Sequence, residues 1–397
     1  MVSYESMVSG NTKVMKNVFH DSIGLISVAL LLVTSGWAAE PVWIPLREIA
    51  KSSSIHVGTA VKYDAIVENA DYRAMVIREY DLVTPENALK WAALRRNAKT
   101  FNFHEADAIV EFAQTNHLLI RGHTLCWNLD KYLPQWMLEN KFTPAQARAL
   151  METHIKTVMG HYRGKIFCWD VVTEAVANNP KGSPLADGFW MRTIGPEYIE
   201  LAFRFAHEAD PQAELFYNDY DLGEPMGAKS DRIYRLVKAL KAKGVPITGV
   251  GLQSHYKVTK PPTAEALQAN IKRLAALGLK VHITELDVSL INDKDPAGVR
   301  QDNLPPLAER LDIQAKIYAD VARAALSTPA CEAIVTWGFS DLWGLERFMR
   351  AAQEKGTEFP QRLPFDMNLK PKPAAFSLAN AIRDANVRRN EQRKSLQ

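Results

Sequence analysis

The sequence VHITELDV, at residues 281–288, indicates how the chain folds. Its closely spaced apolar residues, most of them β-branched, predict a buried β-strand. Glu285 lies where this apolar run ends. A carboxylate at the end of a buried strand needs a reason, because removing a charge from water is costly unless the charge is paired. For Glu285 alone, a structural ion pair or exposure of the strand end to solvent would be a sufficient explanation.

A second glutamate occupies an equivalent place. The sequence FCWDVVTE, at residues 167–174, is another apolar run, and it ends on Glu174. Two carboxyl groups on separate strand ends, surrounded by aromatic and amide side chains, are the groups that glycoside hydrolysis uses. The pair therefore favours a catalytic interpretation over a structural one.

Apolar strand-like runs alternate with helical patterns from about residue 55 onward. Eight runs are expected to be strands, at residues 55–61, 80–84, 118–125, 166–172, 214–217, 249–252, 281–286 and 333–339. Helical periodicity falls between them at residues 106–115, 144–159, 197–209, 229–243, 262–277 and 311–326. This alternation predicts an α/β fold, a (β/α)8 TIM barrel with parallel strands and a single catalytic domain. An open doubly wound sheet is disfavoured because no glycine-rich phosphate turn follows the first run.

The composition excludes several classes of protein. The chain has 397 residues, of which 47% are hydrophobic and 23% charged, and its net charge is +3. No basic patch suited to nucleic acid is evident beyond the short basic end at residues 388–394. Three cysteines without a CxxC pair argue against a zinc site or a disulfide framework. We therefore expect no metal, no cofactor and no nucleic-acid partner.

The N-terminus has the pattern of a secretory signal. A lysine follows Met15, residues 24–33 form an apolar run too short to span a bilayer, and small residues allow cleavage after Ala38. The sequence predicts three parts: an N-terminal extension and signal peptide at residues 1–39 with its start at Met15, a catalytic barrel at 40–384, and a basic flexible tail at 385–397. We expect a secreted or periplasmic protein without membrane association after cleavage. An uncleaved hydrophobic anchor is the alternative.

Polar and aromatic residues gather at the ends of the predicted strands. In a barrel of parallel strands, functional residues come from the C-terminal strand ends, which meet at one mouth. Carboxylates, amides and indoles suit a sugar, because polar groups pair with its hydroxyls while flat apolar rings cover its C–H surfaces. In chain order these residues are Glu86, Asn87, Lys90, Trp91, His123, Trp127, Asn128, Asp170, Glu174, Asn218, Asp219, Tyr220, Gln253, His255, Glu285, Asp287, Trp337, Asp341 and Trp343.

Seven motifs resemble those of family 10 glycoside hydrolases, the endo-β-1,4-xylanases. They occur in the family's order, and the resemblance extends from about Trp43 to Ile382. The motifs are ENALKW at 86–91, RGHTLCW at 121–127, WDVVTEA at 169–175, FYNDY at 216–220, GLQSH at 251–255, ITELD at 283–287 and WGFSD at 337–341. The resemblance implies a hydrolase that cleaves internal β-1,4-xylosidic bonds of xylan with retention of configuration. We expect a monomer.

The resemblance also assigns the chemistry. Glu174 is expected to be the general acid/base and Glu285 the nucleophile, with His255 hydrogen-bonded to Glu285 and Asp287 supporting that histidine. The carboxyl groups of a retaining pair lie about 5–5.5 Å apart, so the nucleophile can attack the anomeric carbon directly. Glu174 must begin protonated and Glu285 ionised. The pKa of Glu174 should therefore be raised.

The residues that bind substrate are carried over from the family in the same way. They are Lys90, His123 and Gln253 beside the scissile bond, Glu86 and Asn87 at the next sugar toward the non-reducing end, Trp337 as a stacking floor, Asn218 and Tyr220 on the leaving-group side, and Trp127, Thr173, His255 and Trp343 elsewhere in the site.

Three features depart from the family pattern. The family has a second tryptophan about five residues after Asp341, whereas Leu345 or Arg347 falls there in this sequence and Trp343 comes earlier. Thr173 stands where the family usually has an asparagine whose amide donates to the sugar 2-hydroxyl, and Asn128 stands where many relatives have histidine. The shorter threonine is not expected to make that contact, which strengthens in the transition state. A slower enzyme is therefore expected, together with a higher kcat for a Thr173→Asn variant.

Other functions remain open on the sequence alone. A β-1,4-glucanase of mixed specificity is the enzymatic alternative, because a pocket for xylose can be loosened to admit a sugar with a hydroxymethyl group. A catalytically weak glycan-binding barrel is the non-enzymatic alternative. Thr173 favours it, while the two glutamates oppose it. A transglycosylase is a third.

Overall fold

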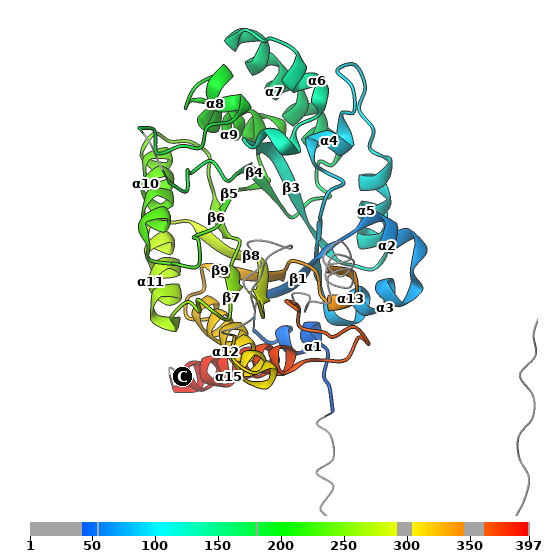
Figure 1. Cartoon of the computed structure of the whole chain (residues 1–397), viewed down its shortest axis with the longest axis vertical. Helices are drawn as coiled ribbons and strands as arrows, with labels where there is room; N and C mark the ends of the chain where they lie inside the picture. The colour runs from blue at the N-terminus through cyan, green and yellow to red at the C-terminus, as the bar shows by residue number, and fades with distance from the viewer. Residues whose placement is uncertain (1–41, 54, 180–181, 292–303, 345–360, 396–397) are drawn as a thin grey trace, which may run out of the picture. The chain divides into compact units, whose positions relative to one another are not determined.

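Parallel strands form the centre of the molecule. The computed structural model describes residues 42–53, 55–179, 182–291, 304–344 and 361–395. The chain divides into two units, residues 1–42 and 43–397, and the strands belong to the second unit. Figure 1 shows these strands as a ring enclosed by helices. The predicted signal peptide at residues 1–39 lies outside the described residues.

Eight strands close into a barrel. They are β1 (His56–Val61), β2 (Leu82–Pro85), β3 (Leu119–Trp127), β4 (Cys168–Thr173), β5 (Glu214–Asp219), β6 (Gly249–Leu252), β8 (Lys280–Ser289) and β9 (Cys331–Thr336). Each strand pairs in parallel with the next one around the ring. The first strand pairs with the last, with Val57 opposite Ile334, and this pairing closes the ring. The predicted (β/α)8 barrel is confirmed.

A short additional strand was not predicted. β7 (His255–Lys257) pairs in parallel with the C-terminal part of β8, with His255 opposite Asp287. Its three residues are too few for an alternating hydrophobic pattern, and two of them are polar.

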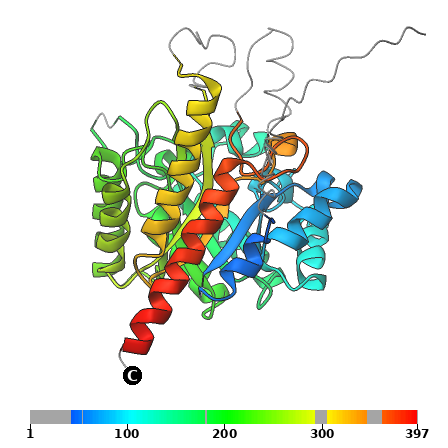
Figure 2. The same ribbon diagram turned by 90° about the horizontal axis from the view of Figure 1, so that it is seen from below.

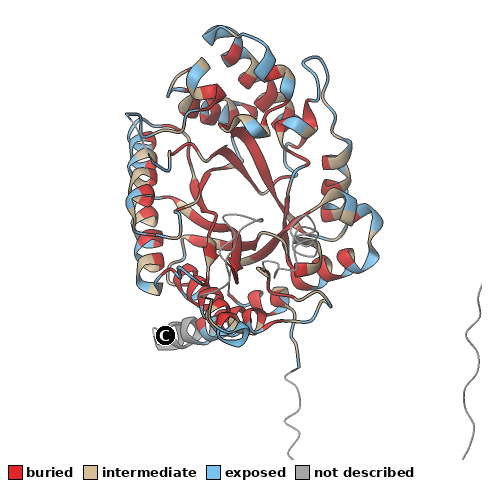
Figure 3. Ribbon diagram, viewed as in Figure 1, coloured by how far each residue is buried: buried red, intermediate tan, exposed pale blue. Residues whose placement is uncertain are grey.

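The strands are buried on both faces, as Figure 3 shows. Every residue of β4 is buried, and so is every residue of β8 after Lys280. Helices cover the outside of a parallel barrel while side chains fill its inside, so its strands read as continuous apolar runs. This explains why the runs could be found in the sequence.

Helices enclose the barrel. They are α1 (Leu46–Ala50), α2 (Tyr63–Glu68), α3 (Ala70–Glu79), α4 (Trp91–Leu94), α5 (His104–Thr115), α6 (Gln135–Glu139), α7 (Pro144–His161), α8 (Phe189–Thr193), α9 (Tyr198–Ala209), α10 (Ala228–Ala242), α11 (Ala264–Ala275), α12 (Leu307–Ala325), α13 (Asp341–Gly344) and α15 (Pro373–Ser395), with the 3-10 turn η1 (Asp130–Tyr132). The six predicted helices are α5, α7, α9, α10, α11 and α12.

Capping residues set the first positions of two helices. Thr143 caps α7 through a capping box with Gln146, and Pro144 occupies the first turn. Thr263 caps α11 by accepting a hydrogen bond from the Ala266 amide, so α11 begins after Thr263 and not at Pro262 as predicted.

Helix α15 packs beside α12 along one side of the barrel (Figure 2). It continues to Ser395, so the part predicted as a flexible tail is helical as far as that residue. The segment from residue 385 to 395 contains no glycine or proline and is rich in arginine, which is compatible with a helix. Within the described residues, no helix is both long enough and apolar enough to cross a membrane.

Candidate active site

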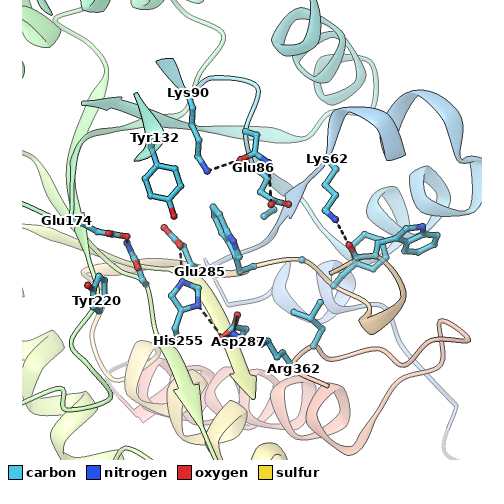
Figure 4. Close-up of a pocket in the computed structure, with 18 of the residues that line it drawn as sticks. Lys62, Glu86, Lys90, Tyr132, Glu174, Tyr220, His255, Glu285, Asp287 and Arg362 are labelled. Atoms are coloured by element: carbon cyan, nitrogen blue, oxygen red, sulfur yellow. Dashed lines mark hydrogen bonds and ion pairs between the residues drawn. The ribbon is translucent and has the colours of Figure 1, made fainter. Parts of the chain in front are cut away.

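A cavity of about 730 Å³ opens at the C-terminal ends of the barrel strands. Figure 4 shows the two glutamates and His255 directed into it. Twelve of the fifteen predicted site residues line this cavity. They are Glu86, Asn87, Lys90, Trp127, Glu174, Tyr220, Gln253, His255, Glu285, Asp287, Trp337 and Trp343.

Glu174 follows directly after β4, in surroundings that raise the pKa of its carboxyl. Its φ angle is +56°, a left-handed conformation that side chains other than glycine rarely take. The Glu174 amide donates to the Asn218 carbonyl at 2.9 Å, and Gln253 Nε2 donates to Glu174 Oε1 at 3.0 Å. Burial raises the pKa of Glu174, and the charges of Asp219 and Glu285 add to this rise, which outweighs the hydrogen bond from Gln253.

Glu285 on β8 has the opposite electrostatic environment, although it is 95% buried. Asn218 Nδ2 donates to Glu285 Oε1 at 2.7 Å, and His255 Nε2 lies 3.0 Å from Oε2. Burial alone would raise the pKa of Glu285, but the hydrogen bonds from His255 and Asn218 and the positive charge nearby bring it below its usual value. Glu285 is therefore the ionised member of the pair.

Charged side chains hold His255, the hydrogen-bond partner of the nucleophile, in place. His255 Nδ1 lies 3.2 Å from Asp287 Oδ1, and Arg362 Nη1 lies 3.2 Å from Asp287 Oδ2. Burial lowers the pKa of His255, but Asp287 and Glu285 outweigh this effect and raise it to about 10. The protonated imidazole therefore donates a hydrogen bond to Glu285 from Nε2 and faces Asp287 as an ion pair on its Nδ1 side. The predicted hydrogen bond from His255 to Glu285 and the supporting position of Asp287 are confirmed.

Irregular strand pairing surrounds these groups. The register shifts between His123 and Cys126 on β3, between Asp170 and Val172 on β4, and between Ile283 and Leu286 on β8. Such bulges are frequent beside active sites, where they change the direction of a side chain. The shift on β8 brackets the nucleophile position.

Asn218 does not line the cavity, contrary to its predicted place on the leaving-group side. It is fully buried, and its amide donates to Glu285 while its carbonyl accepts from Thr284 Oγ1 at 2.7 Å. A Cβ atom on Gly251 would lie 2.4 Å from Asn218 Oδ1, so glycine is required there. Asn218 positions the nucleophile.

Thr173 is also absent from the cavity lining, which corrects its place among the substrate-binding residues and agrees with the expectation that it does not make the asparagine's contact. It is fully buried, and its hydroxyl lies 2.7 Å from the hydroxyl of Thr124. Thr124 donates its own hydroxyl proton to the Asp170 carbonyl at 3.0 Å. Since Thr124 has one such proton, Thr173 must donate to Thr124. Its hydroxyl is thereby directed into the barrel wall.

His123 lies beneath the cavity surface. Its Nδ1 is 2.9 Å from Asp170 Oδ2, and Asp170 is in turn paired with Arg121. The His123 ring meets Trp337 edge to face, with ring centroids 5.3 Å apart. Its Nε2 has no hydrogen-bond partner in the described part of the chain, and its role toward a sugar stays a prediction.

Several lining residues were not predicted from the sequence. Tyr132 and Lys131 reach the cavity from the turn η1, and Lys62, Tyr72 and Arg362 reach it from other segments. Lys131, Tyr132, Tyr72 and Arg362 do not follow a predicted run, so the strand-end rule could not find them. Lys62 directly follows the run at residues 55–61 and was overlooked. Lys131 and Tyr132 come within four residues of Asn128, where the sequence departs from the family pattern. That departure was the one sequence signal that this segment differs from its counterpart in the family.

The described residues contain no cluster of three or more His, Cys, Asp or Glu side chains that could hold a metal ion. The cavity instead offers an ionised carboxylate, a carboxyl of raised pKa, and indole and amide side chains. In a (β/α)8 barrel, two carboxyl groups with opposed pKa shifts at the strand ends define the site of a glycoside hydrolase.

The chain belongs to glycosyl hydrolase family 10, whose family model matches residues 45–381. It is 35% identical to endo-1,4-beta-xylanase B of Thermotoga neapolitana over 366 residues, which is 91% of this chain and 98% of that protein. It is 36% identical to a beta-1,4-xylanase of Dictyoglomus thermophilum over 362 residues, which is 90% of this chain and 97% of that protein.

Solved structures agree with this assignment. Xylanase 10B of Thermotoga petrophila, in complex with xylobiose, matches with a TM-score of 0.77 and 34% identity. The match covers 87% of this chain and 99% of that one. Native xylanase 10B of Thermotoga maritima matches with a TM-score of 0.76 and 34% identity, over 87% of this chain and 100% of that one.

Proposed function

We propose that this protein is an endo-β-1,4-xylanase that retains anomeric configuration, with Glu174 as general acid/base and Glu285 as nucleophile. One observation carries the assignment of roles. The two glutamates line one cavity, and their surroundings shift their pKa values in opposite directions. The relatives named as xylanases, and the xylobiose bound by one of them, support xylan as the substrate class.

In the first step Glu285 attacks the anomeric carbon while Glu174 gives its proton to the departing oxygen. Asn218 and His255 hold the two oxygens of Glu285 and fix the direction of its attack. The bond between the anomeric carbon and the leaving oxygen breaks as the bond to the carboxylate oxygen forms. A covalent glycosyl-enzyme results.

In the second step Glu174 acts as a base. Once Glu285 is esterified, its negative charge no longer raises the pKa of Glu174, so Glu174 is better able to remain ionised. It takes a proton from a water molecule, whose oxygen attacks the anomeric carbon from the side that the leaving group vacated. The bond between that carbon and the Glu285 oxygen breaks, and the Glu285 carboxylate is released. Two inversions give net retention.

Release of reducing sugar from xylan tests the proposal. Wild-type protein should release xylo-oligosaccharides from arabinoxylan and glucuronoxylan, while Glu285→Ala should lose this activity. Release from carboxymethylcellulose at a comparable rate would instead favour a β-1,4-glucanase. A wild type no more active than Glu285→Ala on every polysaccharide would identify a binding barrel.

We also propose that the protein acts as a monomer outside the cytoplasm, after removal of a signal peptide that begins at Met15. The charged start, the apolar run at residues 24–33 and the small residues before Ala38 support export. N-terminal sequencing of exported protein tests this. A mature end that still contains Leu30 would contradict cleavage, and a dimer in light scattering would contradict the monomer.

A further inference from the structure

Tyr132 enters the cavity from outside the barrel strands. It is the last residue of η1, and its ring stacks on Trp127 with centroids 3.6 Å apart and an interplanar angle of 16°. Lys90 Nζ lies 5.5 Å from the centre of the Tyr132 ring. Figure 4 shows its hydroxyl end directed toward the Glu174 and Glu285 carboxyl groups. Among the described residues, the Tyr132 hydroxyl has no hydrogen-bond partner.

The turn that carries Tyr132 is fixed at both ends. The Tyr132 amide donates to the Leu129 carbonyl at 3.0 Å, which closes the turn. Asp130 accepts a hydrogen bond from the Phe189 amide at 2.8 Å, and its other oxygen pairs with Arg192 at 2.5 Å. These contacts attach the turn to α8. Together with the stack on Trp127, they hold the phenol in one orientation, as binding of a rigid substrate requires.

The residue before the acid/base offers no donor to a sugar. Thr173, which precedes Glu174, donates its hydroxyl proton to Thr124 and is fully buried. A side chain directed at the space between the two glutamates meets the atoms attached to the anomeric carbon and its neighbour. The only ring carbon bonded to the anomeric carbon of xylose is C2, and it carries the 2-hydroxyl. The Tyr132 phenol has both a proton to donate and lone pairs to accept.

We propose that Tyr132 hydrogen-bonds the 2-hydroxyl of the sugar that Glu285 attacks, and that it supplies the contact that Thr173 does not make. This inference rests on the proposed function. The contact strengthens as positive charge develops at the anomeric carbon, because the neighbouring hydroxyl then becomes a more polar partner. Its loss is therefore expected to lower kcat more than it changes KM.

The test compares Tyr132→Phe with wild type on two aryl β-glycosides of xylobiose, one intact and one lacking the 2-hydroxyl on the reacting sugar. Phenylalanine keeps the stack on Trp127 and removes the phenol oxygen alone. Tyr132→Phe should lower kcat on the intact substrate by about 10- to 100-fold, the value of one hydrogen bond to a strongly polar group. On the deoxy substrate it should match wild type, because that substrate has already lost the contact.

The matched control is Tyr234→Phe, which removes a phenol oxygen from α10 outside the cavity. It should leave both rates unchanged. Equal rates for Tyr132→Phe and Tyr234→Phe on the intact substrate would overturn the inference, and so would an equal loss of rate on both substrates. Neither result affects the proposed function, which is tested separately by reducing-sugar release from xylan and carboxymethylcellulose.

Discussion

Replacing Glu174 by alanine separates the two steps of the proposed reaction. The surroundings of Glu174 raise the pKa of its carboxyl, as suits a group whose main contribution to the first step is the proton that it gives to the leaving oxygen. General acid catalysis is worth about 10²- to 10⁴-fold in rate, or about 3–5.5 kcal/mol. Glu174→Ala should lose this factor on xylan, whose sugar leaving group needs the proton.

A 2,4-dinitrophenyl glycoside of xylobiose should respond differently, because its leaving group departs without protonation. On this substrate, Glu174→Ala should release a rapid burst of dinitrophenol followed by slow turnover, since the second step lacks its base. Added azide needs no base and fits the space left by the side chain, so it should restore turnover and yield a β-glycosyl azide.

Two controls accompany this experiment. Glu285→Ala should show neither burst nor azide rescue, because no covalent intermediate can form. The melting temperature of Glu174→Ala should stay near that of wild type, because the side chain is only partly buried and Gln253 remains at the cavity surface. An equal loss on xylan and on the dinitrophenyl substrate, without azide product, would refute the acid/base assignment.

Three further predictions concern neighbouring residues. Gln253→Met removes a hydrogen bond that lowers the pKa of Glu174, so the alkaline limb of the kcat/KM profile, where Glu174 loses its proton, should move to higher pH; a shift to lower pH would contradict this. Asp170→Asn breaks the buried pair with Arg121 and should lower the free energy of unfolding in urea by about 3–5 kcal/mol, whereas a loss under about 1 kcal/mol would show that the pair is not needed. Thr173→Asn should raise kcat on xylan. An unchanged or lower kcat would count against the hypothesis that position 173 corresponds to the family's asparagine.

The barrel could be predicted from the sequence because its strands are buried on both faces. The run at residues 249–252 contains only glycine, valine and leucine, and the run at 281–286 contains Val281, Ile283 and Leu286; these two runs correspond to β6 and most of β8. Short helices such as α2 and α4 were missed, since each shows too little of the helical repeat to be distinguished from a loop. Their stability comes from tertiary packing.

Most of the site could be predicted because strand ends meet at one mouth. Glu86, Glu174 and Gln253 each follow a strand directly, so chain position was sufficient to place them. The direction in which a side chain points could not be predicted from chain position. Asn218 points at the nucleophile and Thr173 into the barrel wall, and both orientations depend on hydrogen-bond partners from other strands. Tyr132 was missed because a 3-10 turn has no hydrophobic period.

The pairing of β1 with β9 has a consequence during synthesis. The ribosome synthesises β1 early. The second neighbour of β1 in the ring is β9, which appears only when residues 331–336 have been translated. Until then a nascent barrel carries two unpaired edges that can recruit strands from other chains. Fragments that stop short of residue 331 should therefore aggregate, and a chaperone that shields strand edges should raise the yield of the complete chain.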